Sequence, residues 1–155
     1  MRKKKAPKRF LAPDPKFGDP LVTRFINILM YSGEKSVATK IFYDAMAHIE
    51  KNNPEASGYE IWKEALNNVA PSVEVRSRRI GGATFQIPTE VRPDRKISLS
   101  MKWIVRYTRE RSGRSMYEKL AQELTAAAKK EGASYKKKED THKMAEANKA
   151  FAHFR

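Results

Sequence analysis

The pattern of apolar positions along the chain is mostly helical. Apolar side chains recur three and four residues apart, which places them on one face of an α-helix. The first such set is Val22, Phe25, Ile26, Leu29 and Met30. Prolines, glycines and capping residues divide the pattern into six segments. We therefore predict helices over residues 20–33, 34–51 and 57–70, a fourth opened by Pro93, a fifth over 115–132 and a sixth from about residue 137.

Several of the helix starts carry capping signals. Asp19 is a favoured N-cap residue, and the proline that follows it suits the first helical position. Ser57 with Glu60, and Ser115 with Glu118, have the spacing of a capping box. The sixth segment has only a thin apolar stripe, so we expect it to pack at the edge of the domain or to dock on another molecule. This stripe consists of Met144, Ala147, Phe151 and Phe154.

Residues 73–91 break the helical pattern and predict a β-hairpin. The dipeptide Gly81-Gly82 is typical of a two-residue hairpin turn, because both positions need positive φ angles. The turn places Arg78 opposite Phe85, and Arg76 opposite Ile87. A two-stranded ribbon is marginal in water, so the hairpin needs a partner to lie against. The predicted fold is mainly α: a six-helix, bundle-like domain with one β-hairpin protruding between the third and fourth helices.

The positive charge is concentrated in two parts of the chain. The net charge is +14; residues 1–19 hold +5 and residues 73–114 hold +7, whereas residues 20–72 hold −1. This excess favours a polyanionic partner such as nucleic acid. Residues 1–16 combine basic residues with prolines, and we expect them to form a flexible basic N-terminal arm. Residues 17–155 are expected to form a single helical RNA-binding domain.

The fourth predicted helix presents a basic ridge. Lys102, Arg106 and Arg109 share a face distinct from the apolar stripe, and the ridge follows directly on the hairpin. The alternative is an ordinary solvated helix face. We favour one continuous phosphate-binding surface that also includes the N-terminal arm. Its candidate residues are Arg2, Lys3, Lys4, Lys5, Lys8, Arg9, Arg76, Arg92, Arg95, Lys96, Lys102, Arg106, Arg109, Arg111 and Arg114.

The hairpin arginines suggest a second kind of contact. A guanidinium beside an aromatic ring, as in Arg78 and Phe85, can contact a phosphate and stack on an unpaired base. Alternatively, Phe85 packs against the protein's own helices. The N-terminal arm also has an alternative interpretation, namely a disordered tail that only promotes solubility.

Catalytic and metal-binding motifs are lacking in the sequence. His48 lies in an amphipathic segment, and His142 and His153 lie eleven positions apart, which is not a ligand spacing. The glycine pair lacks the Gly-Lys-Ser/Thr ending of a P-loop, and the chain has no cysteine. No apolar run predicts a signal peptide or a membrane span. We expect no enzyme, no cofactor, no metal and no membrane partner; the competing hypotheses are a DNA-binding basic helical protein and an RNA-acting enzyme.

Several stretches of the chain resemble the family of bacterial small-subunit ribosomal protein seven. They are residues 13–15 (PDP), Gly33 with Lys35, residues 75–88 (VRSRRIGGATFQIP), Trp103, and residues 136–155 (KKKEDTHKMAEANKAFAHFR). The hairpin and the ending are long, contiguous and specific, and the resemblance extends over nearly the whole chain. It departs from the family at Glu34, where a basic residue is usual, and at Tyr107-Thr108, where a small residue and an arginine are expected.

The resemblance implies a fold, a place and a set of partners. It implies six helices with a protruding hairpin, binding to the 3′ major domain of small-subunit ribosomal RNA, and a role in assembling the subunit head in cytoplasmic ribosomes. The implied partners are exit-site transfer RNA, messenger RNA at its exit channel, and small-subunit ribosomal proteins nine and eleven. It adds Lys35 to the ribosomal RNA contacts. The residues implied to lie near transfer or messenger RNA are Arg78, Arg79, Gly81, Gly82, Phe85, Lys143 and His153.

Overall fold

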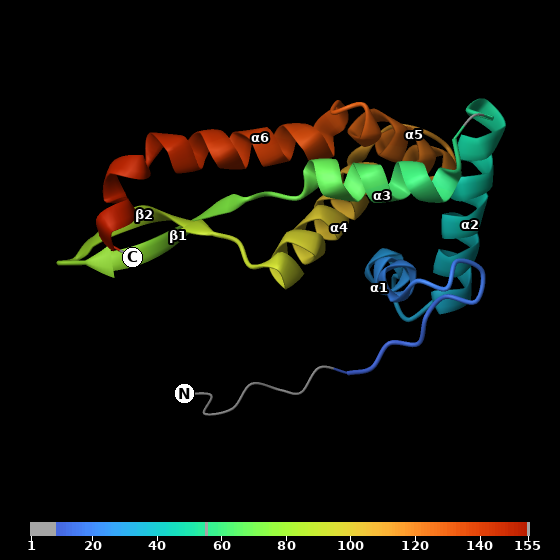
Figure 1. The fold of residues 1–155 in the computed structure, drawn as a ribbon, viewed down its shortest axis with the longest axis horizontal. Coiled ribbons are helices and arrows are strands. Elements are labelled where there is room, and N and C mark those ends of the chain that lie inside the picture. The colour runs from blue at the N-terminus through green and yellow to red at the C-terminus, as the bar shows by residue number, and fades with distance from the viewer. Residues whose placement is uncertain (1–8, 55, 155) are drawn as a thin grey trace.

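The computed structural model describes residues 9–54 and 56–154, in which six α-helices and one β-hairpin follow one another along the chain (Figure 1). The elements are α1 (Pro20–Leu29), α2 (Lys35–Asn52), α3 (Gly58–Val69), β1 (Val73–Ile80), β2 (Ala83–Glu90), α4 (Pro93–Glu110), α5 (Met116–Ala128), α6 (Gly132–Ala147) and the 3-10 helix η1 (Lys149–Phe154). The predicted fold class is confirmed, with the hairpin between the third and fourth helices. Of the described helices, none combines the length and hydrophobicity needed to cross a bilayer.

Helices α1 to α5 enclose one hydrophobic core. At its centre Phe25, Phe42 and Trp62 come from three different helices, and each ring lies 5.6–5.7 Å from the other two. All three side chains are fully buried. Edge-on and tilted aromatic pairs at this spacing contribute more than their buried area alone. These contacts hold α1, α2 and α3 in fixed positions relative to one another.

A glycine allows α2 and α3 to approach closely. A Cβ atom added at Gly58 would lie 2.7 Å from the backbone oxygen of Met46, closer than two such atoms can come. The start of α3 therefore requires glycine for space. The N–H of Gly58 is also bound, since it donates to Oε1 of Glu50 at 3.1 Å.

The predicted helix boundaries and caps need three corrections. The first helix ends at Leu29 rather than at Gly33, because Gly33 and the residue before it have positive φ angles and form a turn. The sixth helix begins at Gly132, well before residue 137. Ser57 and Ser115 occupy the expected N-cap positions, but their side chains make no capping hydrogen bond. The Asp19 cap forms as expected, because Oδ1 of Asp19 accepts a hydrogen bond from the N–H of Leu21 at 2.8 Å.

The start of α6 is fixed by a buried carboxylate. Glu123 on α5 is 1% exposed, and its Oε1 accepts hydrogen bonds from the N–H and the hydroxyl of Ser134 at 2.9 and 2.6 Å. Its Oε2 accepts two further bonds from the guanidinium of Arg111, at 2.8 and 3.1 Å. This long-range cluster joins the end of α4, the middle of α5 and the start of α6. It explains why α6 begins earlier than its apolar spacing indicates.

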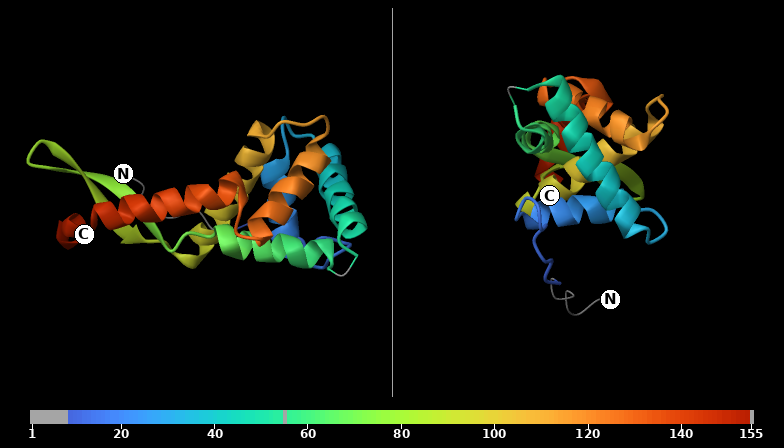
Figure 2. Two further views of the ribbon diagram at one scale, coloured as in Figure 1. Left: turned by 90° about the horizontal axis from the view of Figure 1, so that it is seen from above. Right: turned by 90° about the vertical axis from the view of Figure 1, so that its right-hand side faces the viewer.

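The hairpin has the predicted register and lies against the C-terminal helix. Gly81 and Gly82 have φ angles of 57° and 87°, and the strands pair Arg78 with Phe85 and Arg76 with Ile87. Figures 1 and 2 show α6 and the hairpin extending side by side away from the α1–α5 body, and both strands contact α6. The hairpin therefore has the partner that an isolated ribbon requires.

Two specific contacts join α6 and η1 to the hairpin. The rings of Phe85 and Phe151 lie 5.3 Å apart, and the N–H of Ser72 donates to Nε2 of His142 at 3.1 Å. Burial and the charge of Lys138 lower the pKa of His142, which suits its role as an acceptor.

The apolar stripe predicted for the sixth helix is wrong in part. Met144 and Ala147 are exposed. The buried residues of α6 are instead Ser134, Thr141 and Ala145, because the helix packs through small side chains.

The segment before α1 is anchored by two tyrosine hydroxyls. Tyr43 donates to Asp14 at 2.8 Å and Tyr59 donates to Asp19 at 2.7 Å. Burial and the neighbouring Asp14 raise the pKa of Tyr43 to about 12, so this hydroxyl keeps its proton. Phe17 stacks on Tyr59 with a centroid distance of 5.0 Å. The helical body therefore binds the chain from Asp14 onward, before the boundary expected after residue 16.

Candidate nucleic-acid interface

The basic ridge on α4 forms as a solvent-exposed face. Lys102, Arg106 and Arg109 are all exposed, on the side of α4 opposite its buried residues. Arg106 forms an ion pair with Glu110, with 2.9 Å between Nε and Oε1, which cancels part of the local charge. Arg109 donates to the backbone oxygen of Leu29 at 3.1 Å, so its guanidinium is held at the C-terminal end of α1, where a cation is favoured.

The ridge continues to the base of the hairpin, where α4 begins. Exposed Arg92 occupies the N-cap position of α4 without a capping hydrogen bond from its side chain, and Lys96 is half-buried one turn later. Arg95 and Arg76 both bind the nearly buried carboxylate of Glu74, each with an N–O distance of 2.7–2.8 Å.

This pair of arginines determines the ionisation of Glu74. Burial alone would raise the pKa of Glu74, but hydrogen bonds from Arg76 and Arg95 outweigh burial and hold the pKa below its usual value. The carboxylate therefore stays charged and ties β1 to α4. Two arginines share one carboxylate, so the cluster retains a net positive charge.

The tip of the hairpin carries Arg78 and Arg79 on β1, next to the Gly81-Gly82 turn. Both arginine side chains are exposed, and the tip projects far from the α1–α5 body (Figure 2). Phe85 is half-buried, and one side of its ring meets Phe151. The alternative that Phe85 packs against the protein's own helices is therefore realised in part.

The remaining candidates are spread over several elements. Lys35 is exposed at the start of α2, Arg9 precedes α1, and Arg114 lies in the loop between α4 and α5. Lys143 is exposed on α6, and Nδ1 of His153 on η1 lies 2.8 Å from the backbone oxygen of Ala150. The arm candidates Arg2, Lys3, Lys4, Lys5 and Lys8 lie outside the described residues.

Arg111 has a structural partner that the sequence does not reveal. Its side chain is 31% exposed, and its guanidinium forms an ion pair with the buried Glu123, with 2.8 Å between the closest atoms. A buried carboxylate left without this partner would be strongly destabilising. Most of the charge of Arg111 is therefore directed into the protein rather than toward a phosphate.

Comparison with known proteins points to one family. The family model for ribosomal protein S7p/S5e matches residues 1–149. The chain belongs to this family. Relatives named small ribosomal subunit protein uS7 are 63% identical over 155 residues in Cytophaga hutchinsonii, 64% over 157 in Christiangramia forsetii and 56% over 155 in Campylobacter concisus. In each case the match covers 100% of this chain and 99% of the relative.

Membership of the S7p/S5e family decides between the hypotheses drawn from the sequence. The protein is a structural component of the small ribosomal subunit and not an enzyme. Its general partners are ribosomal RNA and other components of that subunit, and its place is in the ribosome. The DNA-binding alternative loses its main support, because the nucleic-acid partner of a protein of this family is ribosomal RNA.

The basic surface of this S7p/S5e protein includes residues that sequence reasoning missed. Arg24 is half-buried on α1, and its guanidinium reaches the backbone oxygen of Asp94 at 3.5 Å. With Arg109 at the other end of α1, it ties α1 to α4 and brings both helices into one surface. Arg24 is the only basic residue between residues 20 and 29, which was a signal available in the sequence.

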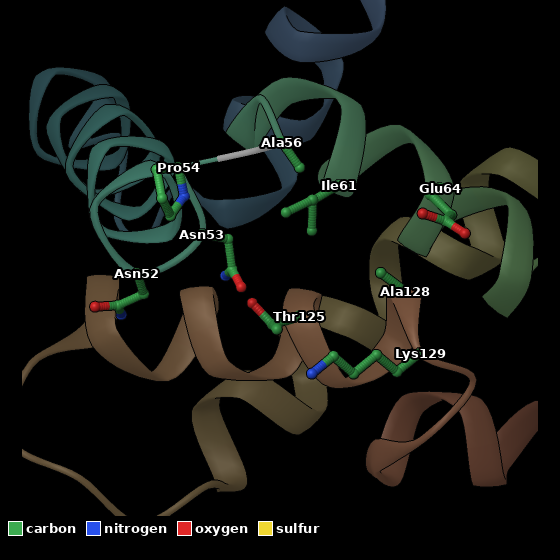
Figure 3. A pocket seen from close by; sticks show the side chains of 9 residues that line it. All are labelled: Asn52, Asn53, Pro54, Ala56, Ile61, Glu64, Thr125, Ala128 and Lys129. Atoms are coloured by element: carbon green, nitrogen blue, oxygen red, sulfur yellow. The ribbon is translucent and has the colours of Figure 1, made fainter.

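A cavity of about 450 Å³ lies apart from this surface, between the end of α2, α3 and α5 (Figure 3). Two of the side chains that line it are ionisable, Glu64 and Lys129, and the others are amide, hydroxyl and apolar groups. Within residues 9–54 and 56–154, no three histidine or acidic side chains gather as metal ligands. The basic surface remains the best candidate for a functional site in the S7p/S5e protein.

Proposed function

We propose that the protein binds the 3′ major domain of small-subunit ribosomal RNA and organises assembly of the subunit head. The contact surface comprises α1, the exposed ridge of α4, the base of the hairpin and the N-terminal arm. Phosphates are neutralised along this surface, and the RNA is recognised through its shape, backbone and unpaired bases.

The distribution of charge on α4 and the hairpin carries this proposal. Residues 73–114 hold a net charge of +7, even though the acidic Glu74 and Glu110 lie among them. Those two carboxylates are already occupied by arginines. Residues 73–114 contain eleven lysines and arginines but only four acidic residues, Glu74, Glu90, Asp94 and Glu110, so RNA phosphates supply the anions for the excess.

The salt dependence of RNA binding tests this part of the proposal. A transcript of the 3′ major domain is titrated at increasing salt, and the affinity is expected to fall with a slope of about −0.7 to −0.9 per phosphate contact. Lys102→Gln with Arg106→Gln should weaken binding and reduce the slope. The matched control is Lys129→Gln with Lys130→Gln, which removes two exposed lysines at the end of α5, outside the proposed surface.

Two results of this titration would count against the proposal. A flat salt dependence would exclude phosphate neutralisation as the source of affinity. Equal competition by duplex DNA or by an unrelated ribosomal RNA domain would exclude specific recognition of the 3′ major domain.

For the tip of the hairpin, we propose a position near exit-site transfer RNA and the messenger RNA exit channel, with small-subunit ribosomal proteins nine and eleven as neighbours. This finer placement is supported by the family resemblance and by the projection of the tip from the body. Arg78→Ala with Arg79→Ala should preserve helical content and subunit assembly. Reconstituted subunits should then retain exit-site transfer RNA less well; unchanged retention together with failed assembly would make the hairpin an assembly clamp instead.

A further inference from the structure

Tyr31 differs from the other tyrosines of the chain in its exposure. The chain has six tyrosines, and the other five are at least half-buried, whereas Tyr31 is 76% exposed. Tyr43 and Tyr59, for example, use their hydroxyls to anchor the segment before α1. Tyr31 lies in the turn between α1 and α2, and within the described residues no other aromatic ring packs against it.

A fixed arginine lies beside this exposed ring. The guanidinium carbon of Arg109 is 5.9 Å from the ring centroid of Tyr31. The same guanidinium donates to the backbone oxygen of Leu29 at 3.1 Å, which limits its freedom. A positioned cation and an aromatic face therefore stand together before any ligand binds, and little ordering is needed on binding.

Near Tyr31 the basic residues outnumber the acidic ones, although Glu34, whose N–H donates to the backbone oxygen of Tyr31 at 3.0 Å, lies just before Lys35. Lys35, four residues after Tyr31, is exposed at the start of α2. The ridge on α4 continues from Arg109 to Lys102 and Arg106, which are also exposed. An exposed ring on an otherwise neutral face would suit a protein partner equally well. A ring with a guanidinium beside it, next to a basic ridge, suits a ligand that offers a flat π surface next to phosphates.

We propose that Tyr31 stacks on an unpaired nucleobase of RNA, with Arg109 beside the stack and Lys35 close to the flanking phosphates. This inference rests on the proposed function, because the base belongs to the ribosomal RNA that the basic surface binds. Unstacked bases are commonly recognised on aromatic and guanidinium planes. Base stacking needs a π face but not a hydroxyl, and this determines the choice of variants.

The test measures binding of the 3′ major domain transcript by three variants. Tyr31→Leu keeps an apolar side chain but removes the ring, and it should weaken binding about 5- to 50-fold. Tyr31→Phe keeps the ring and should bind like the wild type. Val37→Ala changes another exposed apolar residue, at the start of α2, and should have no effect. The slope of affinity against salt should be the same for Tyr31→Leu and the wild type, because no phosphate contact is lost.

Each outcome has a definite meaning. If the wild type binds but Tyr31→Leu binds equally well, the stacking proposal is overturned and the proposed function stands. If Tyr31→Phe weakens binding as much as Tyr31→Leu, the hydroxyl rather than the ring makes the contact, and stacking is again excluded. If the wild type itself does not bind the transcript, the proposed function fails and the stacking proposal fails with it. Equal melting temperatures for all variants verify that the fold is unchanged.

Discussion

The ion pair between Arg111 and Glu123 allows a sharp test of which arginines maintain the fold. In the variant Arg111→Met, Oε2 of Glu123 loses both of its donors while Ser134 still binds Oε1. Removing one partner of a buried pair typically costs 3–5 kcal/mol. Because the Arg111 side chain is 31% exposed, we take the lower end, about 3 kcal/mol. For a chain of this size that corresponds to a melting temperature lower by roughly 6–12 °C.

Thermal unfolding followed by circular dichroism measures this change. Arg114→Met provides the control, because Arg114 is exposed and should change stability by no more than about 0.5 kcal/mol. Glu123→Gln combined with Arg111→Met should recover part of the loss, since it removes the uncompensated charge. A variant Arg111→Met that melts like the wild type but binds RNA poorly would refute the structural role of Arg111.

Three further changes probe the helix contact, the hairpin base and the hairpin support. Gly58→Ala forces a Cβ against the Met46 backbone and should cost about 1–3 kcal/mol in urea unfolding; an unchanged midpoint would show that α3 can move away. The lowered pKa of Glu74 means that its stabilising effect is complete above its ordinary value of 4.5 and is lost as pH falls through the lowered pKa. In the variant Glu74→Gln, the free energy of unfolding should therefore depend less on pH in that acid range. A pH dependence identical to that of the wild type would contradict this. Phe151→Ala should speed amide exchange on β2 while the α1–α5 core keeps its protection; slower or equal exchange would show that the hairpin is stable alone.

The sequence predicted those features that depend on neighbouring residues. The Gly81-Gly82 turn determined the strand register, and Asp19 with the following proline determined the start of α1. Features that depend on distant residues were not predictable in this way. The buried Glu123 binds Arg111 at the end of α4 and Ser134 at the start of α6, so three elements are involved. This cluster moves the start of α6 to an earlier residue, and it directs the side chain of Arg111, a candidate RNA contact, into the protein. The sequence therefore predicted the candidate site as a set of charges, but it did not reveal which of those charges are paired with carboxylates of the protein itself.

The position of α6 along the hairpin also has a consequence for the order of folding during synthesis. The strands pair locally and can form as soon as residues 73–90 emerge, but a ribbon without support is only marginally stable. The residues that support it, in α6 and η1, are made after α4 and α5. The α1–α5 body can therefore assemble its aromatic core while the hairpin still fluctuates. A nascent chain would therefore fold α1 and α4, the helices of the proposed RNA surface, first and acquire a rigid hairpin last.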